Sequence, residues 1–123
     1  MFKGVKKNQY IDLPYEEPAG VIWLSILDCA KYCQSYLKVL NKEKSILNLS
    51  TIKYLTKSMI DNYAYGWVIG EHDIKNSIFH NGVWQCQRSD FFMSPDKNIG
   101  IVICSNTANF YLGSIIDEFV KTV

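Results

Sequence analysis

Three short extended runs near the C-terminus constrain the fold of this chain more than any other feature. Residues 77–80, 88–94 and 100–106 form these runs, and each contains aromatic or β-branched residues that favour strands. A Pro-Asp-Lys-Asn turn over residues 95–98 joins the last two runs as a hairpin. The first run leads into a polar His-Asn-Gly tripeptide at residues 80–82, which we expect to end a strand.

Helical periodicity on both sides of these runs makes the chain α+β. The first helix is expected to begin at Ser25, because Ser25 and Asp28 form a capping box. A second helix is predicted over residues 51–60 with Ser50 as its N-cap, and a third, strongly amphipathic one over residues 110–123. The residues expected to face inward are Ile26, Ala30, Cys33, Leu37 and Leu40, then Ile52, Leu55 and Met59, and finally Leu112, Ile115, Ile116, Phe119, Val120 and Val123.

Further strand predictions complete the sheet. Residues 63–70 are rich in aromatic and β-branched residues and predict a strand, which a turn over residues 71–76 would follow. Residues 10–13 are a candidate for a short edge strand. Residues 99–105 carry apolar side chains on both faces, which is typical of a strand deep in a sheet and covered by helices on both sides. We therefore expect an antiparallel sheet of about three to five strands with helices packed on it.

The length, composition and net charge of the chain exclude several classes of protein. With 123 residues, of which 48% are hydrophobic, the chain is expected to form one domain over residues 1–123, with residues 1–20 as an irregular lead-in. Its net charge of +1 provides no basic field for nucleic acid. The N-terminus lacks the apolar region of a secretory signal, and no apolar run approaches the roughly 20 residues that cross a bilayer. We expect a cytoplasmic location with no membrane association.

Metal or cofactor chemistry is not expected. Cys29 and Cys33 would share one helical face, but two thiols without a second nearby pair make a poor zinc site, so we expect both to be small core residues. His72 lies between Glu71 and Asp73, yet adjacent side chains on a turn diverge, which favours a solvated turn over a metal site. Nothing in the spacing of the four cysteines requires a disulfide.

Several short motifs resemble, in order and spacing, those of one family. The matching segments are Pro18-Ala19-Gly20-Val21, Leu24-Ser25 with Asp28 and Ala30, Asn48-Leu49-Ser50, Tyr65-Gly66-Trp67, His80-Asn81-Gly82, Ser94-Pro95-Asp96 and Ile101-Val102-Ile103-Cys104-Ser105-Asn106. They resemble the serine β-lactamase and penicillin-binding protein superfamily over about residues 15 to 122. The family's third motif is usually Lys-Thr-Gly, and His replaces the Lys in some D-alanyl peptidase and esterase branches. The resemblance implies a partial β-lactamase/transpeptidase-like fold.

The resemblance also implies roles for the residues of the third motif. His80 would face the substrate carboxylate or the catalytic hydroxyl, and Asn81 would help to orient the substrate. Gly82 would let the backbone approach the ligand closely, and the backbone N–H of Val83 would be an oxyanion-hole donor. The alternative is that His80 is a polar residue that caps a strand.

The family's nucleophile motif, Ser-x-x-Lys, has no convincing match. Ser35 and Lys38 fit the bare pattern, but they fall on the polar side of the first helix, midway along it. Ser50 and Lys53 also fit, but Ser50 is better explained as an N-cap. A serine is a weak nucleophile until a neighbouring base takes its proton. The chain therefore resembles the C-terminal portion of a serine hydrolase that would be inactive alone.

Several aromatic residues near the motif have simpler explanations than catalysis. Tyr63 and Tyr65 invite assignment as general bases, but strand packing is the better interpretation, because the family's catalytic Tyr precedes this region. Among the tryptophans, Trp84 is expected to be the most exposed, because it follows the motif in a turn.

Two kinds of function follow from these observations. The first is a remnant or split half of a hydrolase, which would bind a β-lactam, a D-alanyl peptide or an ester only when completed by a complementary N-terminal half. The second is a non-enzymatic module that associates with itself or a partner. An open sheet edge along residues 99–105 would favour a homodimer, in which the helix over residues 110–123 packs across the joint. Full-length bacterial relatives are often periplasmic or secreted.

Overall fold

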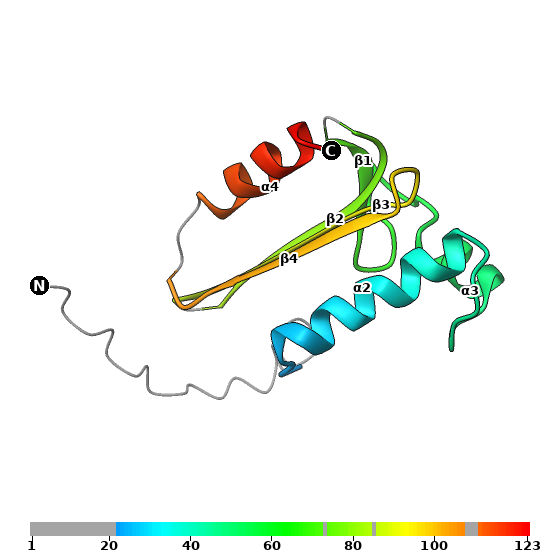
Figure 1. Cartoon of the computed structure of the whole chain (residues 1–123), viewed down its shortest axis with the longest axis horizontal. Coiled ribbons are helices and arrows are strands. Elements are labelled where there is room, and N and C mark those ends of the chain that lie inside the picture. Colours follow the sequence, from blue (N-terminus) through cyan, green and yellow to red (C-terminus); the bar gives the residue numbers. More distant parts are fainter. Residues whose placement is uncertain (1–21, 73, 85, 108–110) are drawn as a thin grey trace, which may run out of the picture.

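The computed structural model describes residues 22–72, 74–84, 86–107 and 111–123, and shows an α+β arrangement (Figure 1). The helices are α2 (Ile26–Leu40), α3 (Leu49–Leu55) and α4 (Leu112–Lys121), and the strands are β1 (Val68–His72), β2 (Ile74–Trp84), β3 (Gln87–Ser94) and β4 (Ile99–Ser105). Among the described residues, helices packed on a four-stranded antiparallel sheet confirm the predicted fold class. The predicted edge strand at residues 10–13 lies outside the described residues.

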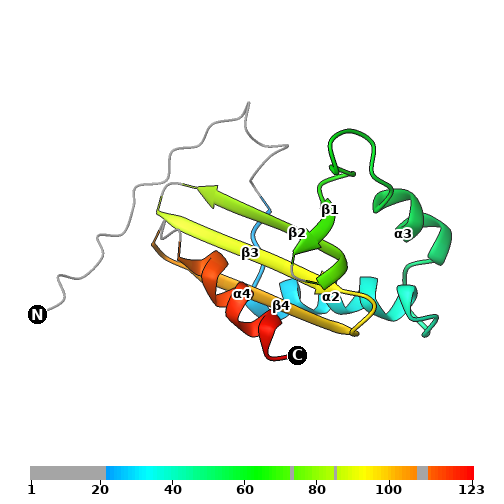
Figure 2. The same cartoon turned by 90° about the horizontal axis from the view of Figure 1, so that it is seen from above.

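The sheet is an antiparallel meander in the order β1-β2-β3-β4 (Figure 2). β2 is longer than the predicted run 77–80, so the His-Asn-Gly tripeptide lies inside the strand and not at its end. The turn predicted over residues 71–76 is also wrong, because β1 continues to His72 and β2 begins at Ile74. Asn76 adopts a φ of 57°, which asparagine tolerates well, and the β1–β2 register shifts between Gly70 and His72.

The sheet carries helices on both faces, α2 and α3 on one and α4 on the other (Figure 1). Val102 of β4 packs against the core cluster that contains α2 and α3, whereas Ile101 and Ile103 pack against the cluster formed with α4. This explains the apolar residues on both faces of β4 and confirms the predicted coverage on two sides. The predicted position deep in the sheet is wrong for the described residues, because β4 ends the strand order and pairs there with β3.

Helix α2 begins where the capping box predicts. Ser25 Oγ accepts a hydrogen bond from the backbone N–H of Asp28 at 3.2 Å and donates one to Asp28 Oδ2 at 2.7 Å. The hydrogen bond from Ser25, followed by that from Lys31, lowers the pKa of the Asp28 carboxyl. Both predicted core cysteines, Cys29 and Cys33, are buried, and all four cysteines are free thiols. Burial raises the pKa of the Cys33 thiol to about 12.

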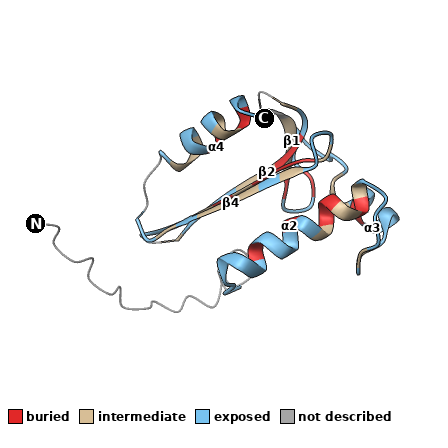
Figure 3. Cartoon of the chain, viewed as in Figure 1, coloured by how far each residue is buried: buried red, intermediate tan, exposed pale blue. Residues whose placement is uncertain are grey.

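The buried face of α2 is rotated from the predicted one and lies nearer the C-terminal end of the helix. Its buried residues are Cys29, Cys33, Tyr36, Leu37 and Val39, and Figure 3 shows most of them in the C-terminal half of the helix. Ile26 and Ala30, predicted to face inward, are exposed. Helix α2 packs mainly against β4, at the end of the described sheet, so the sheet covers only one side of this helix.

The other helices differ from prediction mainly at their ends. The N-cap of α3 is Asn48, whose Oδ1 accepts a hydrogen bond from the backbone N–H of Thr51 at 2.8 Å. Ser50 is therefore in the first turn, and α3 ends at Leu55, which leaves Met59 58% exposed. Helix α4 buries Ile116 and Val120 on the sheet, whereas Ile115 and Val123, predicted to face inward, are exposed. No described helix is long and apolar enough to span a bilayer.

Candidate functional site

The residues predicted to line a substrate cleft lie in the second half of β2, and the pleat divides them between two faces. Ile78 belongs to the core cluster beneath α2, and Phe79 belongs to the cluster beneath α4. Because side chains alternate along a strand, His80 and Gly82 share the α2 face of the sheet. Asn81 and Val83 then lie on the α4 face. The structure therefore does not bring all four residues to one face of the sheet.

His80 has a specific partner on the α2 face. Its Nε2 atom lies 2.9 Å from the hydroxyl oxygen of Tyr63, and either group can donate, depending on the imidazole tautomer. The two rings meet edge to face, with centroids 5.8 Å apart and an interplanar angle of 68°. His80 is half-buried, whereas Tyr63 is 45% exposed. The pair is therefore reachable from solvent, with the imidazole held in one orientation.

A tight turn before β1 places Tyr63. Asp61 and Asn62 have φ angles of 45° and 65°, so both occupy the left-handed region that Asn and Asp tolerate. The backbone N–H of Tyr63 donates to the carbonyl oxygen of Ile60 at 2.7 Å, and that of Ile69 donates to Asn62 at 2.7 Å. Two consecutive residues of positive φ closed by such a bond are typical of a type I′ turn. This turn, and not regular strand packing, directs Tyr63 toward His80, which corrects our interpretation of Tyr63.

An aromatic cluster adjoins this pair. Phe91 of β3 is the cross-strand neighbour of His80, and its ring lies 6.3 Å from that of the buried Trp67. Trp67 also stacks on Tyr32 at 6.1 Å and meets Tyr36 edge to face at 5.5 Å. Burial, followed by the hydrogen bond with Tyr36, raises the pKa of the Tyr32 phenol. Tyr32 therefore remains a neutral phenol at physiological pH.

The Tyr65-Gly66-Trp67 motif supports this cluster through its backbone. Gly66 has a φ of 81°, a conformation that costs any residue with a Cβ atom about 1–2 kcal/mol. The backbone N–H of Ala64 donates to the carbonyl oxygen of Trp67 at 2.7 Å and closes the turn. Tyr65 points elsewhere: it stacks on Tyr54, and their hydroxyl oxygens lie 2.7 Å apart.

The backbone edge of β2 is open beside His80. The β1–β2 ladder ends at the pair Val68 and Phe79, whereas β2 itself continues to Trp84. Among the named strands of the described chain, residues 80–84 therefore pair on one side only, with β3. Alternate residues of such a segment direct their N–H and C=O groups away from the sheet, where an extended ligand can bond to them.

The packing of the chain itself does not explain why residue 82 is glycine. A Cβ atom added to Gly82 would lie 3.5 Å from Ser89 Oγ, which is an ordinary contact, and its φ is not positive. The space above Gly82 therefore stays available for a ligand on the α2 face.

The opposite face carries a buried ion pair that we did not predict. Arg88 Nε and Nη2 donate to Asp90 Oδ2 and Oδ1, each at 2.7 Å, and the side chains are 8% and 5% exposed. The hydrogen bonds that Arg88 donates to Asp90 raise the pKa of Arg88 and keep the guanidinium charged. Asp90 and Arg88 are the Cα partners of Asn81 and Val83. Opposite charges two residues apart in a strand share one face, and this pattern in the sequence could have predicted the ion pair.

The serines that fit the nucleophile pattern make local hydrogen bonds. Ser35 Oγ donates to the backbone carbonyl oxygen of Lys31 at 2.9 Å, within α2. Ser50 Oγ donates to Asn48 Oδ1 at 2.7 Å, in the first turn of α3. Both hydroxyl groups lie on helices of the α2 face, and each bonds to an acceptor in its own helix or cap.

The tryptophans differ from the predicted order of exposure. Trp23 is 58% exposed, whereas Trp84 is only partly exposed and ends β2, so the prediction that Trp84 is the most exposed tryptophan is wrong. Its place in the ladder, opposite Gln87, explains the difference. In the part of the chain that the structure describes, no three His, Cys, Asp or Glu residues cluster as a metal site would need.

The comparisons with known proteins agree with the sequence resemblance. A family model described as Beta-lactamase matches residues 2–114. The comparisons with curated proteins and with solved structures give no match. The family match covers most of the chain, including both helices of the α2 face and all four strands. The chain therefore belongs to the Beta-lactamase family, with a serine-hydrolase-related fold.

Proposed function

We propose that this chain supplies the third-motif wall of a serine hydrolase cleft and carries no nucleophile of its own. The observation that supports this most strongly is the Tyr63–His80 pair, held at 2.9 Å beside the open edge of β2. A polar imidazole next to backbone groups that no described strand pairs suits an extended acyl or peptide ligand with a carboxylate. β-Lactams, D-alanyl peptides and esters are the ligand classes that the family membership suggests.

The contributions of the motif residues differ because the pleat separates them. His80 faces the ligand side with Gly82, whose missing side chain leaves room for a close approach. Tyr63 can hold the Nε2 atom of the imidazole, so that the other ring nitrogen, Nδ1, is presented in a fixed direction. The backbone N–H of Val83 is the proposed oxyanion-hole donor. Asn81, on the other face, would act through its backbone.

The proposed inactivity of the isolated chain is argued from the hydrogen bonds of the two candidate serines. An effective serine nucleophile needs a base within hydrogen-bond reach, about 2.6–3.2 Å. Ser35 and Ser50 instead donate to oxygen atoms of their own helix or cap. A complementary polypeptide that carries Ser-x-x-Lys is therefore the proposed route to activity.

A rate assay tests this proposal. The purified chain is mixed with a chromogenic cephalosporin or a nitrophenyl ester, and hydrolysis is compared with buffer alone. We expect no difference from buffer for the chain or for the Ser35→Ala and Ser50→Ala variants. Turnover that either variant abolishes would overturn the proposal. Turnover that a complementary half restores should depend on His80. The His80→Ala variant should therefore lose this turnover, whereas a matched Tyr65→Ala variant should keep it.

A second candidate function is a non-enzymatic binding or assembly module. The position of β4 at the end of the described sheet favours it, because exposed strand edges pair with other chains. The occupant of this edge would be a second copy, with α4 packed across the joint, or a complementary half. Light scattering tests the first form: a concentration-dependent dimer supports it, and a monomer at high concentration contradicts it.

A further inference from the structure

Ser89 of β3 carries a hydroxyl group on the same face of the sheet as His80. Ser89 pairs with Gly82 of β2, and residues paired across two strands direct their side chains to one face. Ser89 is half-buried, and none of the hydrogen bonds among the described residues uses its hydroxyl group. A Cβ atom at Gly82 would lie 3.5 Å from Ser89 Oγ, so the bare backbone of Gly82 leaves this oxygen approachable. Ser89 therefore offers an unused hydrogen-bond donor beside the His-Asn-Gly motif.

His80 brings a second donor to this face. Its Nε2 atom lies next to Tyr63, on the β1 side of β2, whereas Ser89 lies on the β3 side. Phe91 is the direct cross-strand partner of His80, so Ser89, two residues away on β3, is its diagonal neighbour. Diagonal neighbours in an antiparallel pair have Cα atoms about 7–8 Å apart, and their Cβ atoms are somewhat closer. The Nδ1 atom, when it carries a proton, and the Ser89 hydroxyl can therefore both donate to one ligand that lies over Gly82.

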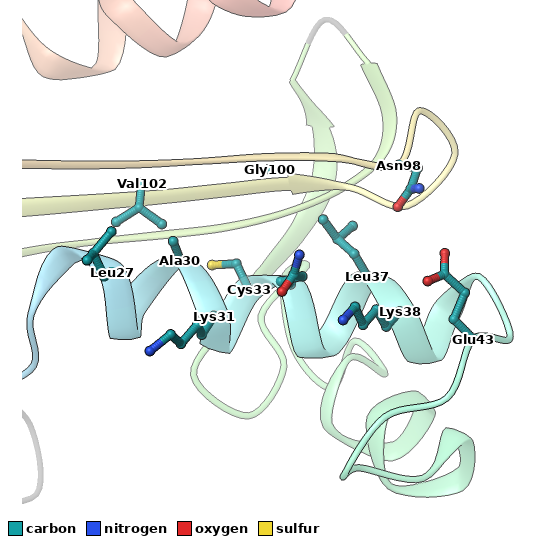
Figure 4. Close-up of a pocket in the computed structure, with 11 residues that line it drawn as sticks. Leu27, Ala30, Lys31, Cys33, Leu37, Lys38, Glu43, Asn98, Gly100 and Val102 are labelled. Carbon is teal, nitrogen blue, oxygen red and sulfur yellow. The ribbon is translucent and has the colours of Figure 1, made fainter.

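Helix α2 leaves this part of the face open. Figure 4 shows Ala30 and Leu37 of α2 directed toward β4, where Gly100 and Val102 line the groove between the helix and the strand. The helix packs mainly against β4, whereas Gly82 is on β2, two strands away, and is exposed. A small polar group of a ligand can therefore approach Gly82 without displacing α2.

The charges around Gly82 favour an anionic ligand. Because side chains alternate along a strand, the α2 face of residues 78–84 and 87–93 carries no acidic side chain. Asp90, the one acidic residue of these two segments, lies on the other face, where it accepts two hydrogen bonds from Arg88. Two donors on one face suit a carboxylate, whose oxygen atoms accept hydrogen bonds of about 2.5–2.9 Å. We propose that Ser89 and His80 form a two-point site for the carboxylate of the ligand, across the space that Gly82 leaves.

This proposal deepens the proposed function and rests on it, because it places the carboxylate end of the acyl or peptide ligand over Gly82. It adds Ser89 as a residue that determines ligand specificity. An amide or ester in place of the carboxylate lacks the charge that strengthens both hydrogen bonds, so such a ligand would bind more weakly. Both donors belong to this chain, so binding of a small carboxylate needs no complementary half, whereas turnover does.

Titration of the isotope-labelled full chain with acetate, followed by NMR at constant ionic strength, tests the proposal. Acetate should shift the imidazole ¹⁵N signals of His80 and the amide signals of Gly82 and Ser89, and the shifts should saturate. Acetamide, which has a similar shape but no charge, should bind at least about fivefold more weakly. Equal binding of the two probes, or acetate-induced shifts that spare these three residues, would overturn the proposal.

Two variants and a control locate the bound carboxylate. Ser89→Ala should weaken acetate binding at least about fivefold and leave the imidazole signals of ligand-free His80 unchanged, which separates a ligand contact from a structural role. Gly82→Ala should abolish binding, because the added Cβ atom fills the space 3.5 Å from Ser89 Oγ. Ser105→Ala is the matched control, because Ser105 is on β4 and its side chain, like that of Ile103, is on the α4 face. Unweakened acetate binding in Ser89→Ala or in Gly82→Ala would overturn the proposal.

The proposed function and the carboxylate site can fail separately. Hydrolysis and covalent labelling test the proposed function, and both depend on a serine nucleophile and not on acetate. A chain that hydrolyses an ester and still binds acetate at Ser89 would overturn only the proposed function. A chain that is inert and does not bind acetate would overturn only the carboxylate site.

Discussion

The buried ion pair between Arg88 and Asp90 predicts a large loss of stability when one partner is removed. Two charge-assisted hydrogen bonds of 2.7 Å join side chains that are 8% and 5% exposed. Each such bond contributes roughly 1.5–3 kcal/mol, and breaking a buried pair from one side typically costs about 3–5 kcal/mol. We therefore expect Asp90→Ala to lower the free energy of unfolding by about 3–5 kcal/mol, because the Arg88 guanidinium loses its buried counter-charge.

Urea unfolding, followed by tryptophan fluorescence and circular dichroism, measures this loss. For a domain of total stability about 5–15 kcal/mol, the midpoint should fall by about 1 M urea or more. Glu118→Ala is the matched control, because the Glu118–Lys121 pair has a similar distance, 2.8 Å, but is 75% and 56% exposed. It should cost under about 1 kcal/mol. The double variant Arg88→Met with Asp90→Leu should be more stable than Asp90→Ala.

A loss of stability in Asp90→Ala no greater than that in Glu118→Ala would contradict this prediction. A double variant less stable than Asp90→Ala would also contradict it, since removal of both charges leaves no buried guanidinium without its Asp90 counter-charge.

Three further predictions follow from single residues. Gly82→Ala should change the free energy of unfolding by under about 0.5 kcal/mol, because a Cβ atom makes only an ordinary contact there. Gly66→Ala should lower it by about 1–2 kcal/mol, because Gly66 has a φ of 81°, and equal losses in urea unfolding would contradict this. Tyr63→Phe should preserve the fold but change the imidazole ¹⁵N shifts of His80, since the 2.9 Å hydrogen bond is lost, and unchanged shifts would refute that contact. Burial raises the pKa of Cys33 to about 12, so between the ordinary thiol pKa of 9.0 and this value the folded state binds more protons than the unfolded state. The free energy of unfolding should therefore fall as pH rises from 9.0 toward 12, and Cys33→Ala should reduce that fall in alkaline unfolding.

Local signals were enough to predict the elements that local chemistry determines. The capping box at Ser25 and Asp28 marks the start of α2, and the Pro95–Asn98 turn joins β3 to β4, as the structure shows. The length of β2 could not be predicted in this way. Its polar residues join the ladder because β3 lies alongside them from Ile78 to Trp84, and cross-strand pairing overrides local propensity.

The candidate site was only partly predictable. The family motif identified His80, but its contact with Tyr63 joins residues 17 positions apart and depends on two left-handed residues, Asp61 and Asn62. Asparagine and aspartate adopt that conformation in many contexts, so the sequence alone does not indicate a turn that directs Tyr63 to His80. The edge position of β4 depends likewise on the order of strands, which apolar patterning does not determine.

Covalent trapping determines whether this chain carries a nucleophile of its own, because it detects a single turnover. The purified chain is incubated with a fluorophosphonate and, separately, with a fluorescent penicillin, and its intact mass is then measured. A chain that supplies a cleft wall without a nucleophile should keep its mass, even after prolonged incubation with either probe. A stoichiometric adduct mapped to Ser35 or Ser50 would contradict the account and identify the chain as an enzyme in its own right.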